Sequence, residues 1–166
     1  MSRILPAALI ALLPATAQAA CPGETFLSCT VGNGKHVEVC IQPGDSAGKG
    51  SFTYTFGPKG APELSLSVPM SAGTVTPWSG VGRSIWASVS FPNDGYDYEV
   101  WHGFDRLDED AGLEAGVNVL QAEKLVASLT CTGGEIAPVF TLEDTMDAAG
   151  YCWYREASRW QRGDCG

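Results

Sequence analysis

The sequence predicts an all-β fold, a small antiparallel barrel or sandwich of about eight strands. Apolar and polar residues alternate with a period of two through most of the chain, which is typical of strands with one buried face. Short segments rich in glycine, asparagine and proline separate these stretches, as hairpin turns do. The six cysteines, an even number, indicate disulfides that fasten a modest core.

The first predicted hairpin covers residues 25–41. Runs of strand-forming residues at 26–29 and 36–41 flank a short turn that contains Asn33 and Gly34. An Asn-Gly pair between such runs is a strong hairpin signal, because both central positions of the turn require positive φ.

Two more hairpins follow the same pattern. Aromatic and hydroxyl side chains alternate over 52–56, and leucine and valine alternate with polar residues over 63–68. The next alternating pair covers 85–91 and 96–100, on either side of a Pro-Asn-Asp-Gly turn at 92–95. These runs supply four of the expected strands.

A last strand pair over 117–120 and 125–131 completes the predicted β domain, which we place at residues 20–131. Residues 132–166 change character and form a C-terminal tail. The stretch 142–150 has acids near its start and glycine at its end, which predicts one short helix.

Residues 1–19 have the features of a signal peptide. Arg3 precedes an uncharged run over 4–13, and Ala17 and Ala19 are spaced as signal peptidase requires. Cys21 could carry a lipid after cleavage, but Gln18 stands where lipid-modified cysteines are normally preceded by leucine. No later stretch approaches the roughly 20 apolar residues of a membrane span. We expect a periplasmic or secreted protein.

The chain is acidic, with 19 Asp and Glu against 10 Lys and Arg and a net charge of −9. Such a surface repels nucleic acid and anionic lipid and suits a cationic partner. The alternative is that the acidity serves only to keep an exported protein in solution.

All six cysteines follow the predicted leader and are expected to form disulfides, although the sequence does not determine their pairing. No Cys-x-x-Cys pair is present, so zinc ribbons and thioredoxin-type redox sites lack support. The residues concerned are Cys21, Cys29, Cys40, Cys131, Cys152 and Cys165.

The segment 44–48 reads Gly-Asp-Ser-Ala-Gly and matches the nucleophile elbow of serine hydrolases. An elbow needs a helix after the serine, whereas an aromatic strand follows Ser46. The only histidines are His36 and His102, so Ser46 with His102 is the one hydrolase arrangement to weigh. We predict that the chain is not an enzyme.

The sequence also predicts no metal and no cofactor. The acids between Asp105 and Glu114 lack the ligand alternation and the glycine of a calcium-binding loop, and we interpret them as a solvated loop. His102 has no second histidine at metal-ligand spacing, and a structural role is expected for it.

Two tryptophans are candidates for ligand contact. Trp86 lies on the serine-rich face of its predicted strand, and Trp78 lies in a Pro-Trp-Ser-Gly loop. Exposed aromatic side chains anchor protein or sugar ligands. A second small core explains Trp86 equally well.

Most of residues 21–131 resembles an uncharacterised family of small periplasmic proteins of Gram-negative bacteria. That resemblance implies export and carries no activity. It rests on the leader together with segments 27–29, 34–35, 39–40, 52–57, 62–64 and 115–117.

A shorter segment, Ser79-Gly80-Val81-Gly82-Arg83, is similar to the inhibitory loop of periplasmic c-type lysozyme inhibitors, which are small disulfide-bearing β-barrels. In that family Tyr or Lys stands where this chain has Arg83. The resemblance implies that Ser79 and the cation act against the two catalytic carboxylates of the enzyme.

We therefore expect an exported, non-enzymatic binding module, with inhibition of a lysozyme or another envelope enzyme as one form of that function. Two alternatives remain open, a serine hydrolase that uses Ser46 and a structural envelope-associated protein. The expected partner is a protein, and a cationic one. The predicted contact residues are Trp78, Ser79, Gly80, Arg83 and Trp86.

Overall fold

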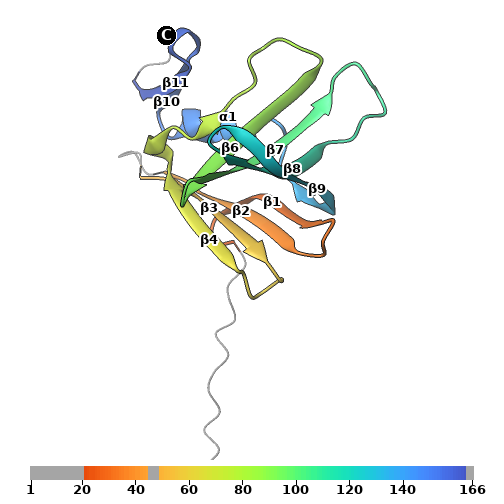
Figure 1. Ribbon diagram of the computed structural model, residues 1–166. Helices are drawn as coiled ribbons and strands as arrows, with labels where there is room; N and C mark the ends of the chain where they lie inside the picture. The colour runs from red at the N-terminus through yellow and green to blue at the C-terminus, as the bar shows by residue number, and fades with distance from the viewer. Residues whose placement is uncertain (1–20, 45–48, 164–166) are drawn as a thin grey trace, which may run out of the picture.

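Figure 1 shows the computed structural model of the chain, which describes residues 21–44 and 49–163. Nine antiparallel strands form one curled sheet, in the order β4-β3-β2-β1-β9-β8-β7-β6-β5. The strands are β1 (Glu24–Val31), β2 (His36–Gln42), β3 (Ser51–Gly57), β4 (Leu64–Pro69), β5 (Val75–Thr76), β6 (Ser84–Asn93), β7 (Tyr96–Asp105), β8 (Glu114–Gln121) and β9 (Lys124–Ile136).

The predicted all-β class is confirmed, and each expected hairpin is present. Strand β1 pairs with β2, β3 with β4, β6 with β7 and β8 with β9. Two short elements were not predicted, the two-residue strand β5 and the 3-10 helix η1 (Met70–Ala72). The sheet continues past residue 131, because β9 runs on to Ile136 beside β1.

The sheet folds so that strands β1–β4 and strands β6–β9 face each other (Figure 1). The alternating apolar residues of both halves meet in this interior. Tyr54 of β3 stacks on Phe91 of β6 and on Tyr98 of β7, with ring centroids 5.3 and 5.8 Å apart. Phe52 and Val89 are fully buried in the same core. Alternation thus produced one buried face, as the sequence predicted.

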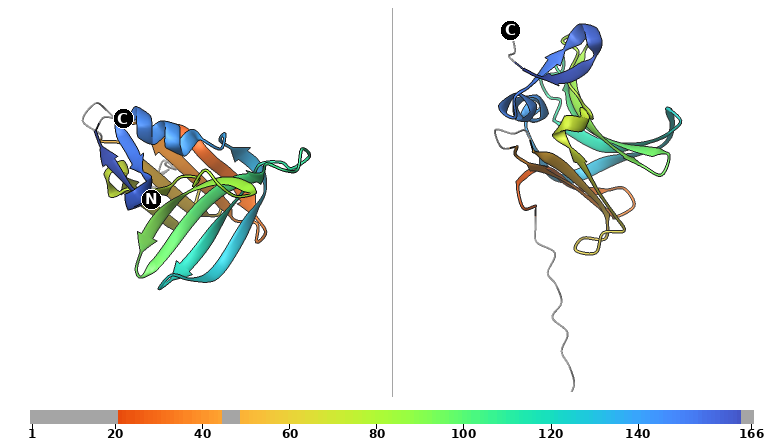
Figure 2. Two further views of the ribbon diagram at one scale, coloured as in Figure 1. Left: turned by 90° about the horizontal axis from the view of Figure 1, so that it is seen from above. Right: turned by 90° about the vertical axis from the view of Figure 1, so that its left-hand side faces the viewer.

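The tail contains a helix and a second, two-stranded sheet. Helix α1 (Thr141–Ala148) precedes strand β10 (Tyr151–Tyr154), the 3-10 helix η2 (Arg155–Ala157) and strand β11 (Arg159–Arg162). Figure 2 shows α1 and the β10–β11 hairpin together at one end of the curled sheet. Leu142 and Met146 of α1 are fully buried in the main core, so the tail is packed onto the sheet.

Disulfides join Cys21 to Cys40 and Cys29 to Cys131. The second bond links β1 to β9, where the two halves of the sheet meet. Cys152 is also disulfide-bonded, and Cys165 lies outside the described residues. In the part of the chain that the structure describes, no helix has the length and apolar composition to cross a bilayer.

Candidate functional site

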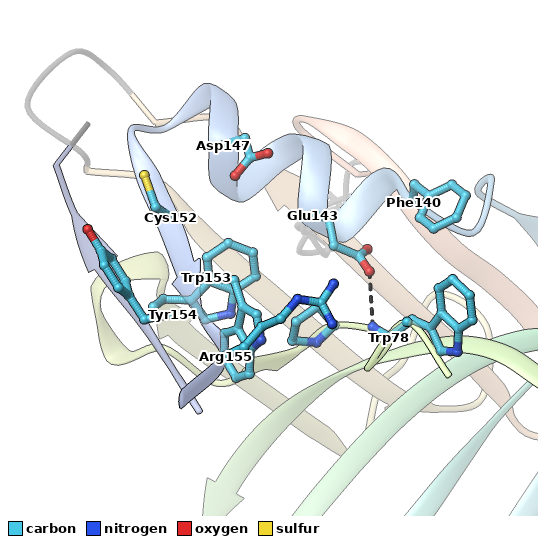
Figure 3. Close-up of a pocket in the computed structure, with 11 residues that line it drawn as sticks. Trp78, Phe140, Glu143, Asp147, Cys152, Trp153, Tyr154 and Arg155 are labelled. Carbon is cyan, nitrogen blue, oxygen red and sulfur yellow. Dashed lines mark hydrogen bonds between the residues drawn. The ribbon is translucent and has the colours of Figure 1, made fainter. Parts of the chain in front are cut away.

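A pocket of about 640 Å³ lies where the tail meets the loop after β5. The loop after β5 and two consecutive segments of the tail, which lie far from that loop in the sequence, line it (Figure 3). The loop supplies Pro77, Trp78 and Gly80. The remaining lining residues are Phe140, Glu143 and Asp147 from α1 and the residue before it, and Cys152, Trp153, Tyr154, Arg155 and Trp160 from the hairpin and η2.

The spacing of residues on α1 directs two carboxylates into the pocket. Glu143 and Asp147 are four residues apart, so they lie one above the other on the same face of the helix. Each directly follows one of the apolar residues Leu142 and Met146, which are buried in the core. Since successive helix residues are turned by roughly 100°, burial of the apolar pair places the acids on a neighbouring face, toward the pocket.

Glu143 is held by the loop that faces it. Its Oε1 accepts a hydrogen bond from the backbone N–H of Trp78 at 3.2 Å, the contact drawn in Figure 3. Its Oε2 is buried and finds no hydrogen-bond partner among the described residues. Burial raises the pKa of this carboxyl, and the negative charges of Asp144 and Asp147 raise the pKa further.

Asp147 occupies a similar electrostatic environment nearer the solvent. Burial raises the pKa of its carboxyl, and the charge of Asp144 adds to the effect. Neither Glu143 nor Asp147 takes part in an ion pair within the described residues, where the two ion pairs are Lys35–Glu63 and Arg83–Asp105. Within the described residues, therefore, no ion pair neutralises the acids of the pocket wall.

The hairpin supplies an aromatic wall. Trp153 and Trp160 are directly paired across β10 and β11, and their ring centroids lie 5.3 Å apart at an interplanar angle of 58°. The indole N–H of Trp160 donates to the carbonyl of Val75 at 2.8 Å, which fastens the hairpin to β5. Tyr154 remains 41% exposed at the rim. The hairpin, fastened to β5, thus places aromatic side chains along the pocket.

A contact across the pocket joins η2 to the loop. The Nη1 of Arg155 donates to the backbone carbonyl of Ser79. Gly80 adopts a φ of +86°, and a Cβ at this position would lie only 3.0 Å from Nη1 of Arg155. Glycine satisfies both the left-handed backbone and the close approach of the guanidinium.

The predicted contact residues are only partly brought together. Trp78 and Gly80 line the pocket. The hydroxyl of Ser79 donates to the carbonyl of Val81 at 3.3 Å, and Arg83 forms an ion pair with Asp105. Trp86 lies on β6 outside the pocket lining and is 37% exposed. A binding role for these five residues stays a prediction.

The acids and rings of the tail were not selected from the sequence as a ligand site. The sequence analysis described the acids of 142–150 only as a helix signal. The four-residue spacing of Glu143 and Asp147, repeated by Leu142 and Met146, was the available indication that one helix face is buried and the next one is acidic.

The histidine considered for a hydrolase lies in the core. His102 is 0% exposed, its ring packs against Phe26 with centroids 4.6 Å apart, and Nδ1 lies 3.2 Å from the carbonyl oxygen of Ala137. Burial lowers the pKa of His102 to about 4. Ser46 lies outside the described residues. Within those residues no group of three or more His, Cys, Asp or Glu side chains could hold a metal ion.

The paired carboxylates also differ in placement from those of a glycoside hydrolase, which flank the scissile bond from two sides. Glu143 and Asp147 come from successive turns of one helix and occupy the same wall. This arrangement suits the holding of a ligand against the opposite aromatic wall.

No protein-family model matches the chain, and comparison with curated proteins and with solved structures returned no match.

Proposed function

We propose that this chain is an exported, non-enzymatic binding protein whose ligand sits in the pocket between the Trp78 loop, α1 and the β10–β11 hairpin. The observation that carries the proposal is the convergence of Glu143, Asp147, Trp153 and Trp160 on one cavity of about 640 Å³. Ligand sites of this kind combine apolar and aromatic walls with a few polar groups that fix orientation.

Export is supported by the signal-peptide pattern and by the disulfides. Two disulfides are present among the described residues, and disulfides persist in oxidising compartments such as the periplasm or the cell exterior. The same compartments hold small ligands and envelope proteins that such a pocket can receive.

The pocket supports the proposal better than the serine and arginine of the Ser79–Arg83 segment do. In a lysozyme inhibitor of the expected type, these two side chains would meet the enzyme's carboxylates. Here the Ser79 hydroxyl contacts Val81 and the Arg83 guanidinium contacts Asp105, so each is already engaged within the chain.

The test is differential capture with the full mature chain. Wild-type protein, Trp153→Ala and Trp86→Ala are immobilised and exposed to the same extract of envelope and secreted components. Trp86→Ala is the matched control, because it removes an exposed tryptophan outside the pocket. We expect one species to be retained by wild type and by Trp86→Ala and lost from Trp153→Ala, with all three proteins folded by circular dichroism.

Equal retention by all three proteins would overturn the proposed site. The inhibitor form is tested separately with c-type, g-type and i-type lysozymes. If all three enzymes stay fully active in a large molar excess of the chain, lysozyme inhibition is ruled out. The capture experiment alone then decides whether the pocket binds a ligand.

A further inference from the structure

We propose that the group bound in this pocket is an organic cation, an ammonium or guanidinium carried on an apolar stem. The inference rests on the proposed function, because it names the chemical class of ligand for the same pocket. Three independent features of the described residues support it: two carboxylates that form no ion pair, the ring of Trp153 on the pocket wall, and an internal guanidinium at the edge of the cavity.

Neither carboxylate of the pocket wall forms an ion pair within the described residues. Glu143 and Asp147 line the wall. The Oε2 of Glu143 is without a hydrogen-bond partner among the described residues. A buried acceptor left unpaired is costly, and a bound N–H donor would satisfy it.

Trp153 lines the pocket with ring surface that no described cation covers, whereas Trp160 is only 9% exposed and packs in the core against Trp153. Cations lie over two other rings, with Arg106 at 5.5 Å from the centroid of Trp78 in the pocket loop and Arg162 at 5.7 Å from that of Tyr151. No such contact occurs at Trp153 or Trp160 within the described residues. Tryptophan is the side chain that attracts a cation most strongly to its face.

Arg155 shows that this space accepts a guanidinium. Figure 3 shows its side chain reaching from the hairpin toward the Trp78 segment, below Glu143. Its Nη1 is bound to the carbonyl of Ser79 rather than to a carboxylate. One cation, already committed to a carbonyl, faces two acids on the pocket wall, and the balance favours a second positive charge over an anion.

An ammonium or guanidinium group on an apolar stem can come from two sources, a free small amine or a basic side chain of a partner protein. The net charge of −9 favours the approach of either one. Neutral sugars also bind to tryptophan and carboxylate groups, so they form the comparison arm of the test. Anionic ligands form a second comparison arm.

The experiment follows the intrinsic tryptophan fluorescence of the full mature chain during titration at constant ionic strength. The small cations are agmatine and spermidine, and the basic protein is a c-type lysozyme. The neutral sugar is chitotriose, and the anion is glutarate. We expect saturable changes with at least one cationic probe and none with the neutral and anionic probes.

Variants without a charge at one position show which carboxylates the cation binding depends on. Glu143→Gln and Asp147→Asn each remove one charge from the pocket wall, and we expect each to weaken cation binding by about tenfold. The matched control is Asp144→Asn, which removes the same charge from an exposed position of α1 that does not line the pocket. For this control we expect a change of about twofold or less.

Each outcome decides between the possibilities. Binding of agmatine or spermidine that depends on Asp147 assigns a small cation, and binding of lysozyme alone with the same dependence assigns a basic side chain of a protein. Binding of chitotriose or glutarate without any cation overturns the inference and leaves the proposed pocket standing. The inference also falls if no cationic probe binds, or if Glu143→Gln and Asp147→Asn bind as tightly as wild type.

Discussion

The interior of the curled sheet and the pocket beside the tail are built on opposite principles. In the interior, residues such as Phe52, Val39 and Val89 are 0% exposed and pack against one another. In the pocket, Asp147 is exposed and Tyr154 remains 41% exposed. The sheet is arranged for stability, whereas the pocket retains polar and aromatic groups that stability alone would not select. The following predictions test this contrast.

The largest effect is expected from the disulfide that joins the two halves of the sheet. Cys29 and Cys131 are 102 residues apart, and the chain-entropy model gives about 4 to 5 kcal/mol for a loop of this length. We expect the Cys29→Ala/Cys131→Ala double variant to lose this much free energy of unfolding. Urea denaturation provides the measurement.

The control for this prediction is the shorter link between Cys21 and Cys40, which are 19 residues apart. Its removal should cost about 3 kcal/mol in the same model. Equal losses from the two pairs would show that loop length does not determine the stabilisation.

Two neighbouring residues on α1 contrast the interior and the pocket directly. Met146 is fully buried in the core, so Met146→Ala should lower the free energy of unfolding by about 3 to 4 kcal/mol. Asp147 faces the pocket, and Asp147→Ala should change the free energy by about 0.5 kcal/mol or less. Thermal and urea unfolding of both variants would contradict the contrast if the two losses were similar.

The buried imidazole makes the interior sensitive to acid. The folded-state pKa of His102, about 4, lies below its ordinary value of 6.5, so the unfolded chain takes up this proton first as the pH falls. The stabilisation is fully present above pH 6.5 and is lost as the pH falls through 4. We expect a loss of about 3 kcal/mol over this window.

The variant His102→Gln isolates this effect, because acids with raised pKa values, Asp97, Glu143 and Asp147, titrate with the opposite sign in both proteins. The difference in free energy of unfolding between wild type and His102→Gln should therefore decrease by about 3 kcal/mol from pH 7 to pH 4. A difference that stays constant would show that the imidazole titrates normally in the fold.

The smallest effect concerns the pocket acid itself. Burial raises the pKa of Glu143, so its ionised form is unfavourable in the folded state and its contribution to stability increases as the pH falls. Glu143→Gln at pH 7 should leave the free energy of unfolding unchanged or raise it by less than about 1 kcal/mol. A loss larger than this in a urea titration would assign Glu143 a structural role.

The sheet was predictable because its signal is local. In β3 the residues Phe52, Tyr54 and Phe56 alternate with hydroxyl side chains, and the same alternation marks β4, β6 and β7. The β10–β11 hairpin was missed because its strands are four residues long and present aromatic or charged side chains at nearly every position. Strand β5, with two residues, is too short to produce a period.

The pocket could be predicted only at Trp78 and Gly80. Its other groups belong to segments about 65 to 80 residues later in the sequence, and the contact of Glu143 with Trp78 depends on how the tail packs against the sheet. Ser79 and Arg83, whose binding role stays a prediction, show a limit of local motifs. The sequence of a loop gives its polar residues but does not show which of them form hydrogen bonds within the same chain.

The disulfide connectivity also bears on the order in which the protein can mature. The pairs Cys21–Cys40 and Cys29–Cys131 are interleaved, so neither bond joins cysteines that are consecutive in the chain. A polypeptide oxidised from its N-terminus as it emerges would first link Cys21 to Cys29, which is not a native bond. Correct maturation therefore requires that Cys29 stay reduced until β9 brings Cys131 to it, or that a thiolate later exchange the early bond for the native one.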